Sequence, residues 1–411
     1  MDDRMDKTSF INMKDSIRSN MVGITEYMYY MALIIYVVLS MISSSMVMNF
    51  FRPKVFVLIM SGMLGILALC EALTFLFIKR YGIREIIGLG VCLFFWYIAE
   101  KNDSSVMLCS YFIIFCGRNI DLQKRYKIIV PLMILVIFGV MWAANEGYIL
   151  QYTMAEEGVY RHTFGFGYPL VLPCYILNIA SMIAVTRKEK ASWTEIAVVF
   201  LVAATFYRWC KADLSFGVTV MVAMLILIVK ALPKIITSDF VLWRIVDKIL
   251  IIIFPLFFLL SLWISLIYDP SVKWMSTLDE ICRGRLSLPH NAINTYGARL
   301  LGQRIGFVGM GLGLDGESVT NGAYNYVDNV YMSLLLRYGV LFSIIALGLL
   351  TVTMYFCYQK KMRIWLWVLS LWALHGLFED KMHFPYYNSL LLIVGQAIQN
   401  VDLRLDKFRK H

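Results

Sequence analysis

Four arginines stand among glycines in the segment that runs from residue 269 to residue 329. They are Arg283, Arg285, Arg299 and Arg304. A guanidinium group presents a planar fork of N–H donors that binds phosphate in bidentate fashion. The cluster therefore predicts an anionic ligand, and phosphate is the candidate that suits it. The alternatives are contact with lipid headgroups, or salt bridges to the acids of the same segment, Asp279, Glu280 and Asp315.

An acid closes this segment, and a further arginine follows it. Asp328 comes directly before an apolar run, with Tyr331 just inside the run and Arg337 two turns deeper. An acid at the start of a helix interacts well with the helix dipole. Asp328 is also placed to accept a proton from a hydroxyl, or to hold an arginine. A charge as deep as Arg337 is costly in lipid and is usually paired. We predict that Asp328, Tyr331 and Arg337 contribute to a site.

A second glycine-rich stretch runs from Arg161 to Pro169 and contains Phe164, Phe166 and Tyr168. Glycines let the backbone approach a ligand closely, and aromatic side chains can line a groove. The alternative is a belt of aromatic residues at the membrane surface, with the proline marking a helix start. Arg161 is included among the candidate binding residues because a lone arginine on the outer side requires a partner.

His375 and Glu379 are four residues apart near the end of another apolar run. On a helix they would share one face, and with a third ligand they could hold a metal. A structural hydrogen bond is the alternative, and we predict no metal site. Glu379 is a candidate general base or arginine partner.

Composition and hydropathy indicate the elements that must position these residues. The chain has 411 residues, of which 60% are hydrophobic and only 16% are charged. About 20 mostly apolar residues are needed to cross a bilayer. We predict an all-α, polytopic membrane protein with about 12 transmembrane helices. They are expected near residues 28–50, 55–78, 83–99, 105–117, 128–144, 168–186, 194–209, 214–230, 249–268, 330–357, 363–379 and 385–400.

The distribution of Lys and Arg predicts the orientation. Most of the 38 basic residues fall in the two tails and in alternate loops, which are expected to be cytoplasmic. The predicted layout has a cytoplasmic tail over 1–27, nine spans over 28–268, a large extracytoplasmic loop over 269–329, three spans over 330–400 and a cytoplasmic tail over 401–411. Apolar periodicity predicts short amphipathic helices over 278–286 and 292–301 of the loop, and a helix from residue 323 onward.

Several function classes are disfavoured. The net charge of +10 would suggest nucleic acid in a soluble protein, but here basic loops that meet anionic lipid account for it. Most of the eight cysteines lie in apolar runs without a C-x-x-C spacing, which disfavours disulfides and thiolate metal sites. The glycine-rich stretch near residue 309 lacks the Gly-Lys-Ser/Thr of a phosphate loop, and no Asp-x-Asp pair occurs. We expect no cofactor and no nucleotide.

At these residues the chain resembles the Wzy-type capsular and exopolysaccharide (O-antigen-like) repeat-unit polymerases, and the Gram-positive members in particular. The shared motifs lie in and after the large loop: Gly-Arg-Leu-x-Leu at 284–288, Leu-Leu-Gly-Gln at 300–303, Val-Asp-Asn-x-Tyr at 327–331 and Leu-Arg-Tyr-Gly at 336–339. The stretch from Arg161 to Pro169 is similar to an Arg…Gly-Phe-x-x-Pro stretch of that family. Glu379 and Asn388 match its late acid followed by Asn.

The resemblance implies a glycosyltransferase of the bacterial plasma membrane with both termini in the cytoplasm. Its substrate would be an oligosaccharide linked to undecaprenyl pyrophosphate. Membrane lipids, a flippase and chain-length regulators would be its partners, and nucleic acid would not. Arg161, Arg283 and Arg285 would then bind pyrophosphate, and Asp328 would contact the acceptor or act as the base. The next candidate site residues would be Arg299, Arg304, Arg337 and Glu379.

Two other functions stay open. A ligase that joins finished glycan to another acceptor would share this topology and these arginines. A flippase or another transporter would carry charged or helix-breaking residues deep in several spans, and a duplicated one would show internal repeats. The sequence shows no internal repeat, and its loop arginines gather on one predicted surface.

Overall fold

Helices form almost all of the regular structure. The computed structural model describes residues 2–101, 105–156, 158–234, 240–310 and 324–402. The first half contains α1 (Asp2–Ser43), α2 (Pro53–Leu73), α3 (Ile83–Lys101), α4 (Ser105–Cys116), α5 (Leu122–Asn145), α6 (Val171–Arg187), α7 (Trp193–Cys210) and α8 (Asp213–Ala231). The second half contains α10 (Val241–Ile251), α11 (Ile253–Ile267), α12 (Lys273–Ile281), α13 (Ser287–Tyr296), α14 (Val330–Ser333), α15 (Val340–Gln359), α16 (Arg363–His375) and α17 (Ile393–Asn400).

Among the described residues, six helical segments are long and apolar enough to cross a membrane. They are Ser16–Ser43, Pro53–Ile78, Leu122–Asn145, Trp193–Cys210, Asp213–Ala231 and Val340–Gln359. The pair α10 and α11, bent by 59°, makes a seventh if it is one span. The prediction of a helical, membrane-embedded chain is confirmed in this form. The other predicted spans correspond to α3, which does not meet the same criterion of length and apolarity, and to helices of 17 residues or fewer, so the number twelve stays a prediction.

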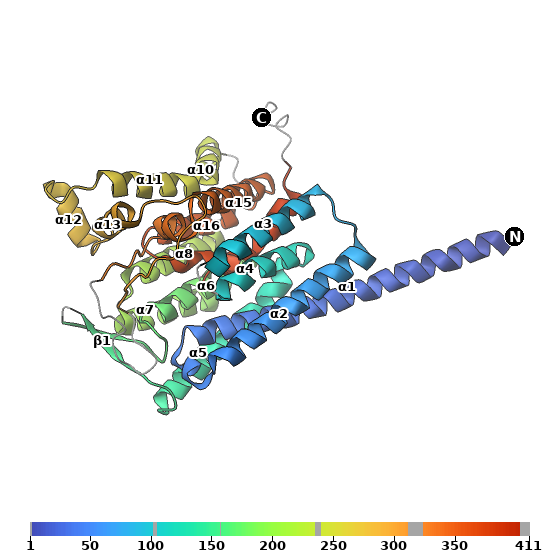
Figure 1. Ribbon diagram of the computed structural model, residues 1–411, viewed down its shortest axis with the longest axis horizontal. Coiled ribbons are helices and arrows are strands. Elements are labelled where there is room, and N and C mark those ends of the chain that lie inside the picture. Colours follow the sequence, from blue (N-terminus) through green and yellow to red (C-terminus); the bar gives the residue numbers. More distant parts are fainter. Residues whose placement is uncertain (1, 102–104, 157, 235–239, 311–323, 403–411) are drawn as a thin grey trace.

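The bundle has two distinct ends. α1 begins, and the described chain ends just after α17, at the end that we call the terminal end (Figure 1). The β-hairpin, α12 and α13 lie at the opposite end, which we call the loop end (Figure 1). At the terminal end, Arg84 Nη1 donates to the Gln399 carbonyl at 2.8 Å. At the loop end, the Gly167 amide donates to the Ser44 carbonyl at 2.8 Å. Which end faces the cytoplasm stays a prediction.

Two local features differ from the predicted layout, which has a polar tail over 1–27 and no strands. α1 runs without a break from Asp2 to Ser43, so the segment expected as a polar tail over 1–27 continues the first span as helix and projects from the bundle (Figure 1). The loop between α5 and α6 forms an antiparallel hairpin of β1 (Thr153–Glu156) and β2 (Val159–His162), in which Met154 faces Arg161. Four-residue strands between turns carry too little periodicity to be recognised in a sequence.

The large loop contains the two expected short helices, with shifted bounds. α12 begins before the predicted residue 278, and α13 ends at Tyr296 rather than at 301. Between them Arg283 and Gly284 both have positive φ, +54° and +78°, which turns the chain sharply. The Asp279 carboxylate accepts the backbone N–H groups that open α13, at 2.8 and 3.0 Å. Asp279 therefore caps a helix and is not the salt-bridge partner that one alternative assigned to it. Asp315 lies outside the described residues.

The predicted tenth span over 330–357 is interrupted, and its helix begins later than residue 323. Asn329 caps α14, with its Oδ1 accepting the Met332 amide at 3.1 Å. A π-helical turn over Leu334–Tyr338 follows, and α15 starts only after Gly339, whose φ is +93°. The Leu-Leu-Gly-Gln and Leu-Arg-Tyr-Gly motifs meet at this break, because the Gln303 amide donates to the Arg337 carbonyl at 3.0 Å.

Close backbone contact explains the glycine in the first of these motifs. Gly302 has a φ of +76°, and a Cβ added to it would lie 2.4 Å from the Arg337 carbonyl oxygen. Gly339 is equally constrained, because its added Cβ would lie 2.2 Å from the Gly302 nitrogen. The large loop is therefore joined to the start of α15 by close backbone contact.

The chain between α16 and α17 is largely non-helical and is held by a polar residue of α6. Asn178 is fully buried, and its Nδ2 donates to the Tyr386 carbonyl at 3.2 Å and to Ser389 Oγ at 3.0 Å. The Ser389 amide donates back to Asn178 Oδ1 at 2.8 Å. Irregular backbone in a membrane protein requires such internal partners. This contact fixes the segment over 376–388, which carries Glu379.

Candidate functional site

A cavity of about 490 Å³ opens at the loop end, and we call it the polar cavity. Its volume falls in the range of small-molecule sites, roughly 300–1,000 Å³. Its walls come from five segments: 43–46, 167–174, 307–310, 324–328 and 379–387. The polar lining includes three consecutive serines, four tyrosines, two acids and one lysine. Hydroxyls and aromatic faces beside charged groups suit a hydrated, polyhydroxylated ligand such as a sugar.

Asp328 is one of the two acids in the polar cavity. Tyr324 donates its hydroxyl to Asp328 Oδ2 at 3.2 Å, and Arg285 Nη2 lies 3.8 Å from the same oxygen. Burial, helped by the negative charge of Asp380, raises the pKa of Asp328 to about 6, and Arg285 opposes that rise. A carboxylate with a pKa close to neutral is suited to accept a proton in catalysis. An arginine near Asp328, one of the two alternatives left open for this acid, is thus present in the structure.

Glu379 and Lys381 enter the same cavity from the segment after α16. Burial raises the pKa of Glu379 well above its ordinary range, and Lys381 works against that rise. Burial lowers the pKa of Lys381, but Tyr326, Glu379 and Asp380 around it raise that pKa by more. Lys381 Nζ also lies 5.7 Å from the centre of the Tyr387 ring. The cavity therefore combines two carboxyl groups, both with raised pKa values, with the positive charge of Lys381.

Arg337 lies behind the cavity wall. Its guanidinium carbon is 4.7 Å from the centre of the Phe307 ring and 5.3 Å from that of Tyr326, and both rings line the cavity. The Tyr326 hydroxyl donates to Asp380 Oδ2 at 2.5 Å. Arg337 thus contributes positive charge through two aromatic rings rather than by direct contact. The free-energy cost of placing the Arg337 charge inside an apolar run is offset by cation–π contact, which contributes about 0.5–2 kcal/mol per ring.

The four loop arginines do not converge. Arg285 alone among them approaches the described carboxylates of the polar cavity. Arg283 Nη2 lies 3.4 Å from Asp213 Oδ2, and both side chains are more than half exposed. Arg299 and Arg304 are exposed, and Arg304 Nε donates to the Lys101 carbonyl at 3.4 Å.

Arg161 and Tyr331 lie apart from the lining of the polar cavity. Arg161 is buried on β2, at the same end of the bundle. Tyr331 is buried too, and its hydroxyl donates to the Ala373 carbonyl at 2.8 Å, where it joins α14 to α16. The structure therefore gives Tyr331 a packing contact beside the cavity rather than a place in its wall.

The expected pairing of His375 with Glu379 on one helix face is wrong, because α16 ends at His375. His375 is buried, and its Nε2 lies 3.1 Å from Ser215 Oγ of α8. Glu379 follows the helix and faces the polar cavity instead. No group of three or more His, Cys, Asp or Glu side chains suited to a metal occurs in the part of the chain that the structure describes. All eight cysteines are free thiols.

Sequence reasoning missed Lys381 and the serines at 43–45. Lys381 lies in a predicted outer loop, where basic residues are rare because Lys and Arg favour cytoplasmic loops. A lone basic residue on the outer side requires a partner, so the reasoning applied to Arg161 applies equally to Lys381. The serines lie within the first predicted span, and nothing in their spacing brings them near residue 379.

No family model, no curated protein and no solved structure matches this chain.

Proposed function

We propose that this chain is a polysaccharide polymerase that acts at the outer face of the plasma membrane. It transfers a growing glycan from undecaprenyl pyrophosphate onto an incoming lipid-linked repeat unit. The observation that carries the proposal is the polar cavity at the loop end, where Asp328 with a raised pKa lies beside Arg285 and shares a lining with Glu379 and Lys381.

The chemistry assigned to the cavity is a displacement at the anomeric carbon. A hydroxyl of the acceptor unit attacks that carbon, its proton passes to the Asp328 carboxylate, and the bond from carbon to pyrophosphate oxygen breaks. The pyrophosphate leaves with the lipid and carries the bonding electrons. Arg285 and Lys381 stabilise the negative charge that builds on it, and removing one such preorganised group typically costs about 3–4 kcal/mol. Glu379 is the second candidate base.

Tyrosine side chains of the cavity supply the surface for the sugars. Tyr168, Tyr324 and Tyr387 come from three different segments of its lining. Aromatic rings contact the apolar faces of sugar rings, and the nearby serine hydroxyls can bond to their polar edges. The chemistry needs no nucleotide and no metal, because the lipid pyrophosphate is already an activated leaving group.

A transporter of lipid-linked oligosaccharides is the second candidate, and one observation favours it. Helices are discontinuous at two places: α14 and α15 are separated by a π-helical turn at the loop end, and α10 and α11 bend by 59° farther from it. Broken helices and intramembrane acids are common in transporters. A ligase would use the same cavity on a different acceptor, so it differs from the polymerase only in its product.

The deciding experiment places purified protein in liposomes that contain undecaprenyl-pyrophosphate-linked repeat units and no nucleotide. The polymerase yields a ladder of lengthened glycans. Movement of intact units across the bilayer without lengthening would replace the proposal with a flippase.

Matched variants locate the activity. Asp328→Asn and Glu379→Gln are each expected to lower elongation by about 100-fold or more if the residue is the base. Glu280→Gln, at an exposed acid of α12, is the control and is expected to elongate normally. Full elongation by both cavity variants would remove the catalytic assignment.

A further inference from the structure

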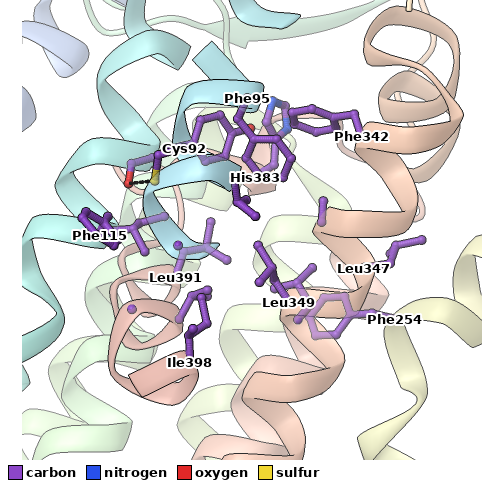
Figure 2. A pocket seen from close by; sticks show the side chains of 18 of the residues that line it. Cys92, Phe95, Phe115, Phe254, Phe342, Leu347, Leu349, His383, Leu391 and Ile398 are labelled. Atoms are coloured by element: carbon purple, nitrogen blue, oxygen red, sulfur yellow. Dashed lines mark hydrogen bonds between the residues drawn. The ribbon is translucent and has the colours of Figure 1, made fainter. Parts of the chain in front are cut away.

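A second, apolar cavity with a volume of about 120 Å³ lies between helices of the bundle, and we call it the apolar groove. Figure 2 shows its walls: Phe95 of α3 and Phe115 of α4 face Phe342 of α15, with Leu391 and Ile398 lying below them. The Cys92 thiol, which could introduce polarity, donates to the Tyr111 carbonyl at 3.6 Å (Figure 2). Such a lining suits a hydrocarbon chain and not a sugar.

The apolar groove is separate from the polar cavity. No residue lines both. At the loop end the groove is bounded by Tyr331 and Met382, which are 1% and 2% exposed. Lys381 faces the polar cavity while its neighbour Met382 faces the groove. A lipid chain in the groove therefore does not carry its headgroup into the polar cavity, and the carrier of the proposed substrate is not the occupant that this geometry favours.

The terminal end of the groove carries the two arginines of its lining, Arg84 and Arg118, together with Gln399. Arg118 is neutralised, since its Nη1 and Nη2 donate to the two Glu71 carboxylate oxygens at 2.7 and 2.9 Å. Arg84 Nη1 donates instead to a backbone carbonyl, that of Gln399. Within the described part of the chain no carboxylate oxygen lies within 4.0 Å of the Arg84 guanidinium. A positive charge thus stands at the mouth of an apolar groove.

We propose that the groove binds an anionic glycerophospholipid, with one acyl chain between α3 and α15 and its phosphate on Arg84. Basic residues placed between helices near the membrane surface attract anionic headgroups. Ile87, one turn from Arg84, lines the groove and is 57% exposed, so a chain can enter sideways from the bilayer. The proposal does not depend on the polymerase function, because neither the lining nor the charge belongs to the polar cavity.

Native mass spectrometry of the purified full chain tests this site. Delipidated protein is mixed with phosphatidylglycerol or with phosphatidylcholine of the same acyl chains, and lipid adducts are counted. We expect phosphatidylglycerol to be retained about fivefold more, the factor that corresponds to ~1 kcal/mol per basic residue at an anionic headgroup. Arg84→Gln should remove this preference, and Arg84→Lys should keep it. Arg80→Gln, which removes an exposed cation outside the groove, is the matched control and should also keep it.

A second pair of variants tests the acyl chain. Ala346→Phe fills the groove and should abolish retention of both lipids. Gly348→Phe adds similar bulk to α15 where nothing lies within 4 Å, and it should retain them. Equal retention of the two lipids by the unaltered chain, or equal effects of Arg84→Gln and Arg80→Gln, would overturn the proposal. Displacement of phosphatidylglycerol by undecaprenyl phosphate at equal concentration would also overturn it, because the groove would then hold the carrier lipid.

Discussion

Removal of Arg285 offers a direct measure of the electrostatics in the polar cavity. Arg285 Nη2 lies 3.8 Å from Asp328 Oδ2, and the two side chains are 20% and 27% exposed. Two unit charges at that separation interact by about 4 kcal/mol at an effective dielectric constant of about 20. Solvent screens this partly exposed pair, so we take about 1.4 kcal/mol, which is a factor of ten in proton affinity.

Arg285→Gln is therefore expected to raise the pKa of Asp328 from about 6 by at least about one unit. At pH 7 the ionised fraction of Asp328 then falls from about nine tenths to about half. The infrared band of the protonated carboxyl group, measured across pH as a difference from Asp328→Asn, reports this titration directly. It needs no substrate and no assumption about activity.

Arg283→Gln is the matched control. Arg283 lies two residues away in the sequence, but its partner is Asp213, at 3.4 Å. The Asp328 midpoint should not move in that variant. An unchanged midpoint in Arg285→Gln, or equal shifts in the two variants, would refute the assignment of Arg285 as the cation that acts on Asp328.

Three further predictions concern stability, each measured by thermal unfolding in detergent. The pKa of Asp328 in the folded state is raised above its ordinary 3.8, so ionisation of this carboxyl lowers the free energy of unfolding as pH rises from about 4 to about 6. Asp328→Asn removes this loss and should raise the free energy of unfolding by up to about 3 kcal/mol above pH 6, with no change near pH 4. Gly302→Ala forces a Cβ into backbone at positive φ and should cost about 2 kcal/mol or more, whereas Gly306→Ala, with nothing within 4 Å, should change stability by less than about 0.5 kcal/mol. Arg118→Met leaves the Glu71 carboxylate without its cation, although the Tyr81 hydroxyl still donates to it, and should lower stability by about 3–5 kcal/mol. The double variant with Glu71→Leu should recover most of that loss.

The sequence predicts the helical class and most helix positions, because membrane spans are specified by local apolar length. It fails where tertiary contact interrupts a span. The break before α15 results from backbone contact between Gly302 and Gly339, and the irregular chain after α16 is held by Asn178 of α6. Neither contact has a local pattern, since the partners are far apart in the sequence.

For the candidate site, the sequence indicates single unusual residues better than it indicates which of them lie together. Asp328, Glu379 and Arg285 were recognised as unusual charges and do lie at one cavity or beside it. Arg299 and Arg304 carry the same local signature, yet they are exposed elsewhere on the loop. Charge in an unexpected place predicts that a residue requires a partner, but the distance between two such residues depends on the turns that separate them.

The lining of the polar cavity is assembled from residues 43 to 387 of the 411-residue chain. Contacts of such long sequence separation form late, after the spans that they connect have been inserted. A ribosome-bound chain that ends before residue 379 has neither Glu379 nor Lys381. The polar cavity is therefore incomplete until the last of its lining residues has been synthesised, and a product truncated before residue 379 lacks two of the three charged groups of that lining, Glu379 and Lys381.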